Sequence, residues 1–514
     1  MKTISALSFA LAMLISCNGK EKEKGKEEEE APTLSVTPDT RAVIFSAAGV
    51  ATTGSAEIIV TTNVAAGWTA VSDQTSWLTV TASGKSGDKL MLTAAPNLTT
   101  ATPPEATVTI NAGNATPVEI TATQGEAVYE FGNGVMPRNI LEDYLSRSIT
   151  QAEFLVTDPY YNDGEYPYKE DDTRMLKNIG AKFIGRSIYT WNNFFCFNNA
   201  NFLKNAKSKI EEMHAFDPDI IFQGAIFEIV STKVDYISVP AWVFEAFGMP
   251  VETRNFIYRD MLNKQGQYVN NWGTGASVPD ITQLETRLFF YFMARKYMEI
   301  GVEAIHFGQA ELMAMSDKNN NYASWKELLD KVRKTALTVA RHGTVICDAH
   351  LPSGGIVIDG KLLFDFVSFP MRPREVMSTP QNATLQKNYL DAIYGKTKGG
   401  VTPSGWSCDR CPYIIEFDNF GISSHPGTGN LNEHSIWGYD EISWFYKQPE
   451  SYRNEFLEYA NNWIKTNDTN GFLQMPGSRV ITGCDVNRYR ANTQGDACPL
   501  GKSQEETIKR IWNR

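Results

Sequence analysis

The sequence lacks the features that mark membrane-spanning, nucleic-acid-binding and nucleotide-dependent proteins. No stretch reaches about 18 consecutive apolar residues, so we expect no transmembrane helix. There is no basic stripe or arginine-rich segment, and the net charge of −11 would repel phosphate backbones, so we expect no nucleic-acid partner. The G-x-S-x-G, H-E-x-x-H and G-x-x-x-x-G-K-[ST] motifs are absent, and nothing indicates a dinucleotide or a flavin. We therefore expect no cofactor.

Cysteine is scarce, with seven residues in 514. An exported protein could oxidise them, and the spacing suggests Cys484–Cys498 as a loop staple and Cys408-x-x-Cys411 as a tight disulfide. Zinc at the second pair is disfavoured because no further Cys or His pair stands at metal-ligand spacing. We expect no metal site.

The N-terminus carries a targeting signal. Lys2 precedes a short apolar run at 4–15, which is too short to span a bilayer. The run ends in Leu14-Ile15-Ser16-Cys17, which resembles a bacterial lipobox, and this implies a signal peptide at 1–16 and lipidation of Cys17. Residues 17–30 then form an acidic tether that is similar to the surface-export signal of Bacteroidetes lipoproteins. We predict an outer-membrane lipoprotein of the cell envelope that is exposed at the cell surface and held only by its lipid.

Residues 31–125 are rich in Thr, Val, Ala and Ile and contain short alternating runs that are separated by Gly and Asn turns. Such alternation predicts strands with one buried face. About seven short strands in a segment of this length are typical of a β-sandwich. The clearest runs are 56–61, 77–80, 89–92 and 106–110.

Several residues of this segment match a known pattern: Gly67-Trp68, Ser76-Trp77-Leu78-Thr79-Val80, Ser83-Gly84, Asn97, the strand 106–110 and the closing Ile120-Thr121-Ala122-Thr123-Gln124-Gly125. On these residues the segment resembles the BACON domain of Bacteroidetes surface proteins. The resemblance implies carbohydrate binding, although a spacer role is the alternative. We expect Trp68 and Trp77 to be core residues.

In residues 126–514, strand-like apolar runs alternate with segments of helical period, such as 286–300, 325–340 and 452–465. This alternation predicts βαβ units and a parallel sheet. Eight candidate strands give the count of a (β/α)8 TIM barrel, so the full chain is predicted to be multidomain, with an all-β sandwich before an α/β barrel. The strands are 152–158, 181–189, 219–228, 304–311, 344–350, 364–370, 413–418 and 471–475.

Acidic residues recur where these strands end, which is where a (β/α)8 barrel carries its active site. Glycoside hydrolysis needs two carboxyl groups that flank the scissile bond. Glu311 ends the fourth strand and Glu416 lies near the end of the seventh, a placement that resembles the retaining clan A glycoside hydrolases. The resemblance implies that Glu311 is the acid/base and Glu416 the nucleophile. The clan usually has Asn before its acid/base, whereas this chain has Ala310.

Other carboxylates remain open as catalytic candidates, namely Glu228, Asp348 and Asp418. Asp418 would serve with Glu416 if the enzyme inverts, because inversion needs a larger separation. Candidate substrate-binding residues at the strand ends and in the long insertion 231–285 are Trp191, Trp272, Arg186, His306, Gln309, His350 and Asn419. Arg186 and Arg372 could hold an acidic sugar or form ordinary salt bridges.

These observations predict a surface-anchored glycoside hydrolase that cleaves an extracellular polysaccharide or glycan by a retaining, two-carboxylate mechanism. Its expected partners are the carbohydrate, the membrane through the lipid, and other proteins of a glycan-uptake system. The alternative is a surface glycan-binding lipoprotein without catalysis, which the missing Asn before Glu311 favours.

Overall fold

The computed structural model describes residues 30–47, 49–95, 97, 103–125, 129–156, 168–376, 378–379, 382–419 and 440–512. The chain forms two compact units, Met1–Val128 and Tyr129–Arg514. The predicted signal peptide, Cys17 and the tether up to residue 29 lie outside the described residues. Within the described residues, no helix has the length and apolar character needed to cross a membrane.

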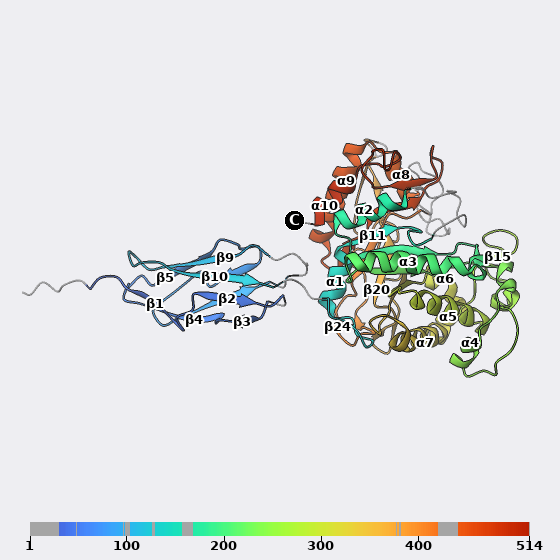
Figure 1. The fold of residues 1–514 in the computed structure, drawn as a ribbon, viewed down its shortest axis with the longest axis horizontal. Coiled ribbons are helices and arrows are strands. Elements are labelled where there is room, and N and C mark those ends of the chain that lie inside the picture. Colours follow the sequence, from blue (N-terminus) through green and yellow to red (C-terminus); the bar gives the residue numbers. More distant parts are fainter. Residues whose placement is uncertain are drawn as a thin grey trace, which may run out of the picture. The chain divides into compact units, whose positions relative to one another are not determined.

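The N-terminal unit is built from two β-sheets, drawn in blue in Figure 1. One sheet has the order β1-β4-β8-β6 and the other β3-β2-β10-β9-β5-β7. All pairings are antiparallel except that of β10 with β2. The strands are β1 (Leu34–Thr37), β2 (Ala42–Phe45), β3 (Ala51–Thr53), β4 (Glu57–Thr62), β5 (Trp68–Ser72), β6 (Leu78–Val80), β7 (Ser83–Gly84), β8 (Lys89–Ala94), β9 (Ala106–Asn111) and β10 (Val118–Gln124).

Alternation along these strands builds an apolar core. In β4 and β8 every second residue is buried, so Ile58, Val60, Leu90 and Leu92 point inward while their neighbours face solvent. Trp68 and Trp77 are 2% and 8% exposed, which confirms that they are core residues. The four runs named from the sequence all fall on described strands.

The C-terminal unit is built around a ten-stranded curled sheet of order β26-β25-β20-β17-β16-β13-β12-β11-β27-β28. All neighbouring strands are parallel except β27 and β28. The strands are β11 (Ser148–Gln151), β12 (Phe183–Tyr189), β13 (Ile221–Ala225), β16 (Ala304–His306), β17 (Ile346–His350), β20 (Phe366–Pro370), β25 (Tyr413–Glu416), β26 (Gly471–Leu473), β27 (Met475–Val480) and β28 (Arg488–Arg490).

The two ends of this sheet meet in one stretch of chain. Only Gln474 separates β26, which pairs with β25, from β27, which pairs with β11. The backbone N–H of Gln474 donates to the carbonyl of Ile415 at 2.8 Å, so the chain leaves one edge strand and joins the other within one residue.

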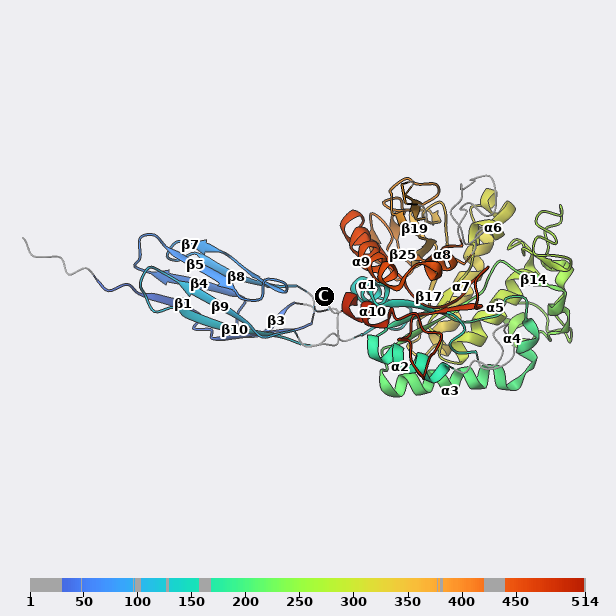
Figure 2. The same cartoon turned by 90° about the horizontal axis from the view of Figure 1, so that it is seen from above.

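Helices follow most of these strands (Figure 2). The predicted helical segments 286–300, 325–340 and 452–465 are confirmed as α5, α7 and α9. The helices are α1 (Arg138–Ser146), α2 (Lys169–Ile179), α3 (Ala200–Phe216), α4 (Ala241–Ala246), α5 (Leu284–Glu299), α6 (Ala310–Ala314), α7 (Ala323–Val339), α8 (Glu441–Lys447), α9 (Glu450–Asn467) and α10 (Glu505–Trp512).

Short strands take the place of helices after two strands of the curled sheet. Within the described residues, no helix lies between β17 and β20 or between β20 and β25, which departs from a regular βα alternation. The additional strands are β14 (Val230–Ser231), β15 (Ala276–Ser277), β18 (Val357–Ile358), β19 (Lys361–Leu362), β21 (Arg374–Glu375), β22 (Ala383–Thr384), β23 (Gly400–Val401) and β24 (Ser407–Cys408).

The cysteine pairings suggested by the spacing are wrong in this structure. Cys408, Cys411, Cys484 and Cys498 are free thiols, as are Cys196 and Cys347. The Cys408 and Cys411 thiols face different carbonyl groups, those of Gly400 at 3.7 Å and Asp365 at 3.6 Å. No group of three His, Cys, Asp or Glu residues gathers as metal ligands in the described part of the chain.

Candidate active site

A cavity of about 390 Å³ lies where the parallel strands of the curled sheet end. Residues after β11, β13, β16 and β25 contribute to its wall, together with the end of β12, the end of β17 and the β27–β28 hairpin. The lining residues are Ala152, Glu153, Arg186, Tyr189, Trp191, Phe227, Glu228, Gly308, Gln309, His350, Asp418, Asn419, Arg479, Val480, Thr482, Asn487 and Arg488. Side chains from strands far apart in sequence therefore meet in one place, as an active site requires.

Glu228 lines the cavity just beyond β13 and is held there by its neighbours. Its Oε2 accepts the backbone N–H of Gln309 at 2.9 Å, and its carbonyl accepts the indole N–H of Trp272 at 2.8 Å. Gly308 has φ +38, and a Cβ there would lie 2.2 Å from Glu228 Oε2. Glycine at 308 therefore leaves the space that the carboxylate occupies.

Asp418 is the second carboxylate of interest in the lining, and it follows β25. It is 8% exposed, its Oδ1 accepts the N–H of Asn419 at 2.8 Å, and this oxygen lies 3.6 Å from Arg479 Nη2. Its own backbone N–H donates to the buried Glu441 carboxyl at 3.1 Å. Burial, with the nearby charge of Asp418, raises the pKa of Glu441 to about 8, so this supporting carboxyl is protonated at neutral pH.

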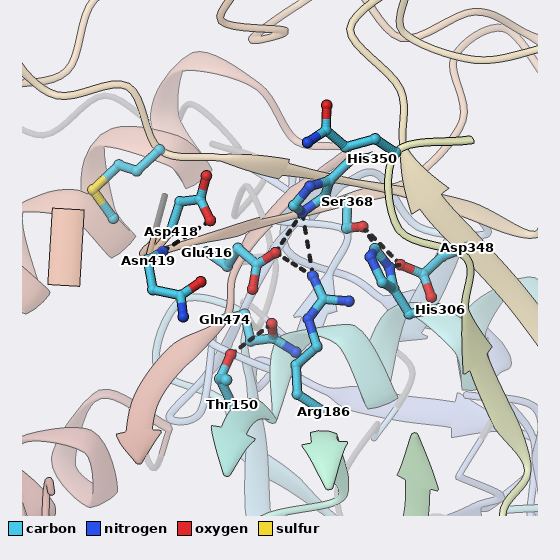
Figure 3. Close-up of polar contacts among 12 residues, drawn as sticks. Thr150, Arg186, His306, Asp348, His350, Ser368, Glu416, Asp418, Asn419 and Gln474 are labelled. Atoms are coloured by element: carbon cyan, nitrogen blue, oxygen red, sulfur yellow. Dashed lines mark hydrogen bonds and ion pairs between the residues drawn. The ribbon is translucent and has the colours of Figure 1, made fainter. Parts of the chain in front are cut away.

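Glu416, the last residue of β25, lies beneath the cavity at the centre of a charged cluster (Figure 3). Its Oε1 is ion paired with Arg186 Nη2 and lies 2.5 Å from His350 Nε2. Its Oε2 lies 2.5 Å from Arg479 Nη1. Glu416 is fully buried and does not line the cavity, whereas all three of its partners do.

The electrostatics of this cluster keep Glu416 ionised. Burial alone would raise the pKa of Glu416, but the guanidinium groups of Arg186 and Arg479 and the hydrogen bond from His350 hold it well below the usual range. Arg186 reaches Glu416 from a bulge in β12, where the pairing with β13 shifts register and Arg186 takes φ +55. At neutral pH Glu416 therefore has no proton to give.

A neutral polar layer lies deeper in the sheet. Asp348 accepts hydrogen bonds from Gln223 Nε2 at 2.7 Å and Ser368 Oγ at 2.7 Å, and its Oδ2 lies 2.8 Å from His306 Nδ1. Burial and then the charge of Arg186 lower the pKa of His306 to about 3, so the imidazole is neutral. Asp348 and His306 are fully buried and do not line the cavity.

Aromatic rings form one wall of the cavity. Trp191 is 40% exposed, and its ring packs edge-on against Phe227 at 5.7 Å and Trp272 at 5.3 Å. Tyr189 packs against Phe227 at 5.1 Å. A half-exposed indole beside hydrogen-bonding groups suits the apolar face of a sugar ring.

The structure brings together most of the predicted site residues, but not Glu311. Strand β16 ends at His306, so residues 307–309 form a loop and Glu311 falls on α6, where it accepts a hydrogen bond from Ser353. It does not line the cavity. Predicted residues in the lining are Glu228, Asp418, Trp191, Arg186, Gln309, His350 and Asn419, whereas Glu416, Asp348 and His306 lie beneath it and Trp272 lies behind Trp191.

The sequence analysis missed three charged residues of the lining, namely Glu153, Arg479 and Arg488. The two arginines lie on β27 and β28, beyond residue 475, where the eighth strand was expected to end. Glu153 follows β11, which occupies 148–151 instead of the predicted 152–158. A longer eighth strand, read through Val480, would have placed Arg479 at a strand end.

Comparison with known proteins gives one family match and several structural likenesses. Residues 33–127 match the family model described as the viral BACON domain. No curated protein matches the chain.

Among solved structures, the chain is similar to a Bacteroides ovatus GH5 xyloglucanase in complex with a XXXG heptasaccharide, at 11% identity and a TM-score of 0.32, covering 94% of this chain and 100% of that one. It is also similar to the β-glucuronidase of Ruminococcus gnavus, at 10% identity and a TM-score of 0.34, covering 94% and 69%. The Lactobacillus rhamnosus β-glucuronidase follows at 12% and 0.34, covering 94% and 67%. These structural neighbours are glycoside hydrolases, and at these scores we base no argument on them.

Proposed function

We propose that the C-terminal unit is a glycoside hydrolase with its active site in this cavity. One observation carries the proposal: Glu228 and Asp418, from different strand ends, line a single cavity with an exposed indole on its wall. Hydrolysis of a glycosidic bond needs two carboxyl groups beside a bound sugar, and rigid strand ends can hold them.

Glu228 is our candidate for the proton donor. Glu416 cannot take this role at neutral pH, because its pKa lies far below the usual range. Glu228 lines the cavity and, among the described residues, forms no ion pair, so no cation favours its ionised form over its protonated form. Its proton would pass to the oxygen of the leaving sugar as the bond to the anomeric carbon breaks.

Asp418 takes the second role, which the sequence analysis assigned to Glu416. Glu416 is enclosed by Arg186, His350 and Arg479, whereas Asp418 lines the cavity directly. The reaction consumes one water, whose hydroxyl group ends on the anomeric carbon and whose remaining proton restores the acid. Glu416 is then a positioning residue that holds the two guanidinium groups and His350 in place.

We further infer that the sheet closes into a (β/α)8 barrel, with 471–480 as its eighth strand. The pairing of β26 with β25 and of β27 with β11, with only Gln474 between them, supports this closure. The retaining course predicted from the sequence rested on Glu311 and Glu416, and it remains a proposal that product stereochemistry tests.

The test is sugar release from a panel of plant, microbial and host glycans by wild type, Glu228→Gln and Asp418→Asn. We expect each variant to lose roughly 10²- to 10⁴-fold in activity, as for removal of a general acid or base, with an unchanged melting temperature. Glu311→Gln is the matched control, since the same change outside the cavity should leave activity within about twofold of wild type. Proton NMR of the first product would give retention or inversion.

Two results would count against this proposal. If Glu228→Gln keeps full activity while Glu311→Gln loses it, the acid is the one predicted from the sequence and the cavity is misassigned. If wild type releases no sugar yet binds one glycan on an affinity gel, the protein is the non-catalytic glycan-binding lipoprotein.

We also propose that the protein is a lipoprotein on the cell surface, which rests on the lipobox-like Leu14-Ile15-Ser16-Cys17 and the acidic tether. Metabolic labelling with a fatty acid should mark wild type and not Cys17→Ala. Protease added to whole cells should remove the protein; survival of the protein until the outer membrane is broken would show that it faces inward.

A further inference from the structure

Three arginines line the cavity, namely Arg186, Arg479 and Arg488. Guanidinium groups bind carboxylates and sulfates in a bidentate manner, so three of them in one cavity suggest an acidic sugar at first sight. Whether they can bind one depends on which of their nitrogens already have partners.

Each of these arginines is already ion paired inside the protein. Arg186 binds Glu416, Arg479 binds the same carboxylate from its other side, and Arg488 binds Glu153. Arg488 Nη1 also donates to the carbonyl of Ala152 at 3.1 Å.

The remaining nitrogens of Arg186 do not change this conclusion. Its Nε and Nη1 have no hydrogen-bond partner, but both atoms are buried and not exposed to the cavity. Figure 3 shows that the free end of this guanidinium points toward His306, away from Glu416 and Asp418. Arg372, the other arginine considered from the sequence, is paired with Asp391 at 2.7 Å and does not line the cavity.

Negative charge outnumbers positive charge among the aspartates, glutamates and arginines of this site. Glu153, Glu228 and Asp418 line the cavity and Glu416 lies beneath it, against three guanidinium groups. A carboxylate on the ligand would meet like charge without an uncommitted cation. Sugar hydroxyl groups, in contrast, can donate to these carboxylates, and the exposed face of Trp191 suits an uncharged ring.

We propose that this cavity accepts an uncharged sugar residue and rejects uronic acids and sulfated sugars, because its arginines are committed to its own carboxylates. The proposal rests on the proposed function only in taking the cavity as the sugar site. It makes Glu153 a specificity-determining residue, since Glu153 neutralises the arginine of the β27–β28 hairpin.

The test uses matched ligands that differ only at C6: glucose against glucuronic acid, galactose against galacturonic acid, and their p-nitrophenyl glycosides in both anomeric forms. Binding is followed by saturation-transfer NMR and cleavage by release of nitrophenol. For wild type we expect binding of at least one neutral sugar and at least tenfold weaker binding of its uronic counterpart, because a buried, unpaired charge costs more than one charge-assisted hydrogen bond recovers.

Two variants make the arginine argument specific. Glu153→Gln leaves Arg488 without its carboxylate and should strengthen binding of the uronic sugar about tenfold, the strength of one charge-assisted hydrogen bond. Glu153→Gln combined with Arg488→Gln removes both charges and should abolish this gain. The double variant leaves no unpaired arginine at this position, so it keeps the test informative if the single variant folds poorly.

The outcomes separate this proposal from the proposed function. Binding of neutral sugars without cleavage of any substrate supports the specificity and overturns hydrolysis. Cleavage of a uronide in preference to its neutral counterpart upholds hydrolysis and overturns the specificity. If wild type binds neither member of any pair, the cavity is not a site for these sugars and the inference fails.

Discussion

The two units solve the problem of filling a β-sheet interior in opposite ways. The interior of the N-terminal unit is apolar, with residues such as Val43, Ile58, Leu90 and Ile120 fully buried. Across the curled sheet of the C-terminal unit, buried side chains include Gln223, His306, Asp348, Ser368 and Glu416.

This difference shows where the chain has been shaped by something other than stability. An apolar interior stabilises a fold directly, whereas buried charges cost desolvation free energy that their pairing only partly returns. Aromatic residues show the same contrast. All three aromatic residues of segment 31–125, Phe45, Trp68 and Trp77, are buried, while Trp191 on the cavity wall is 40% exposed. The N-terminal unit thus offers no aromatic platform to a sugar, which favours the spacer role.

The largest effect on stability should come from Glu416→Gln. This change removes the carboxylate between Arg186 and Arg479 and leaves two buried guanidinium groups without their counter-charge. We expect the free energy of unfolding of the C-terminal unit to fall by about 3 to 5 kcal/mol, measured by urea denaturation. Glu311→Gln, the same change at a half-buried helical position, should stay within about 0.5 kcal/mol of wild type. Equal stability of the two variants would show that the cluster is not what holds this interior.

A second effect depends on pH and belongs to His306. Its pKa is lowered from 6.5 to about 3 in the folded chain, so between these values the unfolded chain binds the extra proton. The stabilising contribution is complete above pH 6.5 and is lost as the pH falls toward 3, at about 1.4 kcal/mol per pH unit.

Denaturation at pH 7 and pH 5 of wild type and His306→Gln checks this expectation. The difference between the two proteins should change by about 2 kcal/mol over this interval. The N-terminal unit has no histidine in residues 31–125 and provides an internal reference. A difference that does not change with pH would mean that His306 is not held neutral.

Trp68→Phe tests the apolar side of the comparison. The indole is 2% exposed, its N–H donates to the carbonyl of Lys85 at 2.8 Å, and its ring packs against Gly84. Loss of this hydrogen bond and of part of the ring should lower the free energy of unfolding of the N-terminal unit by about 1 to 2 kcal/mol. Val71→Thr, an exposed position on the same strand, should change it by less than about 0.5 kcal/mol. Fluorescence-monitored denaturation would compare the two, and equal effects would place Trp68 outside the core.

The sequence predicted the element types better than it predicted their ends. Parallel strands buried on both faces are continuous apolar runs, and these are visible in sequence for seven of the large sheet's strands. The first strand was displaced, because 152–155 is as apolar as β11 itself but forms a turn instead.

The same uncertainty decides the candidate site. A run such as 304–311 does not reveal that pairing stops at His306, and three residues separate the cavity from α6. Glu416 was placed correctly at a strand end, yet its burial under Arg186 and Arg479 depends on contacts between strands that sequence spacing does not report. The cysteine pairs failed for the same reason, since proximity along the chain does not set the direction of a thiol.

The smallest expected effect concerns the exposed aromatic wall. In Trp191→Ala the sugar would lose its stacking partner while Glu228 and Asp418 keep their positions, so binding should weaken without a change in the chemical step. We expect KM to rise about tenfold with kcat within about twofold, consistent with the loss of one aromatic contact. Phe195→Ala is the matched control, because Phe195 is 42% exposed but does not line the cavity, and steady-state kinetics should not change. A fall in kcat with KM unchanged would instead assign Trp191 to the positioning of the carboxyl groups and remove it from the sugar-binding wall.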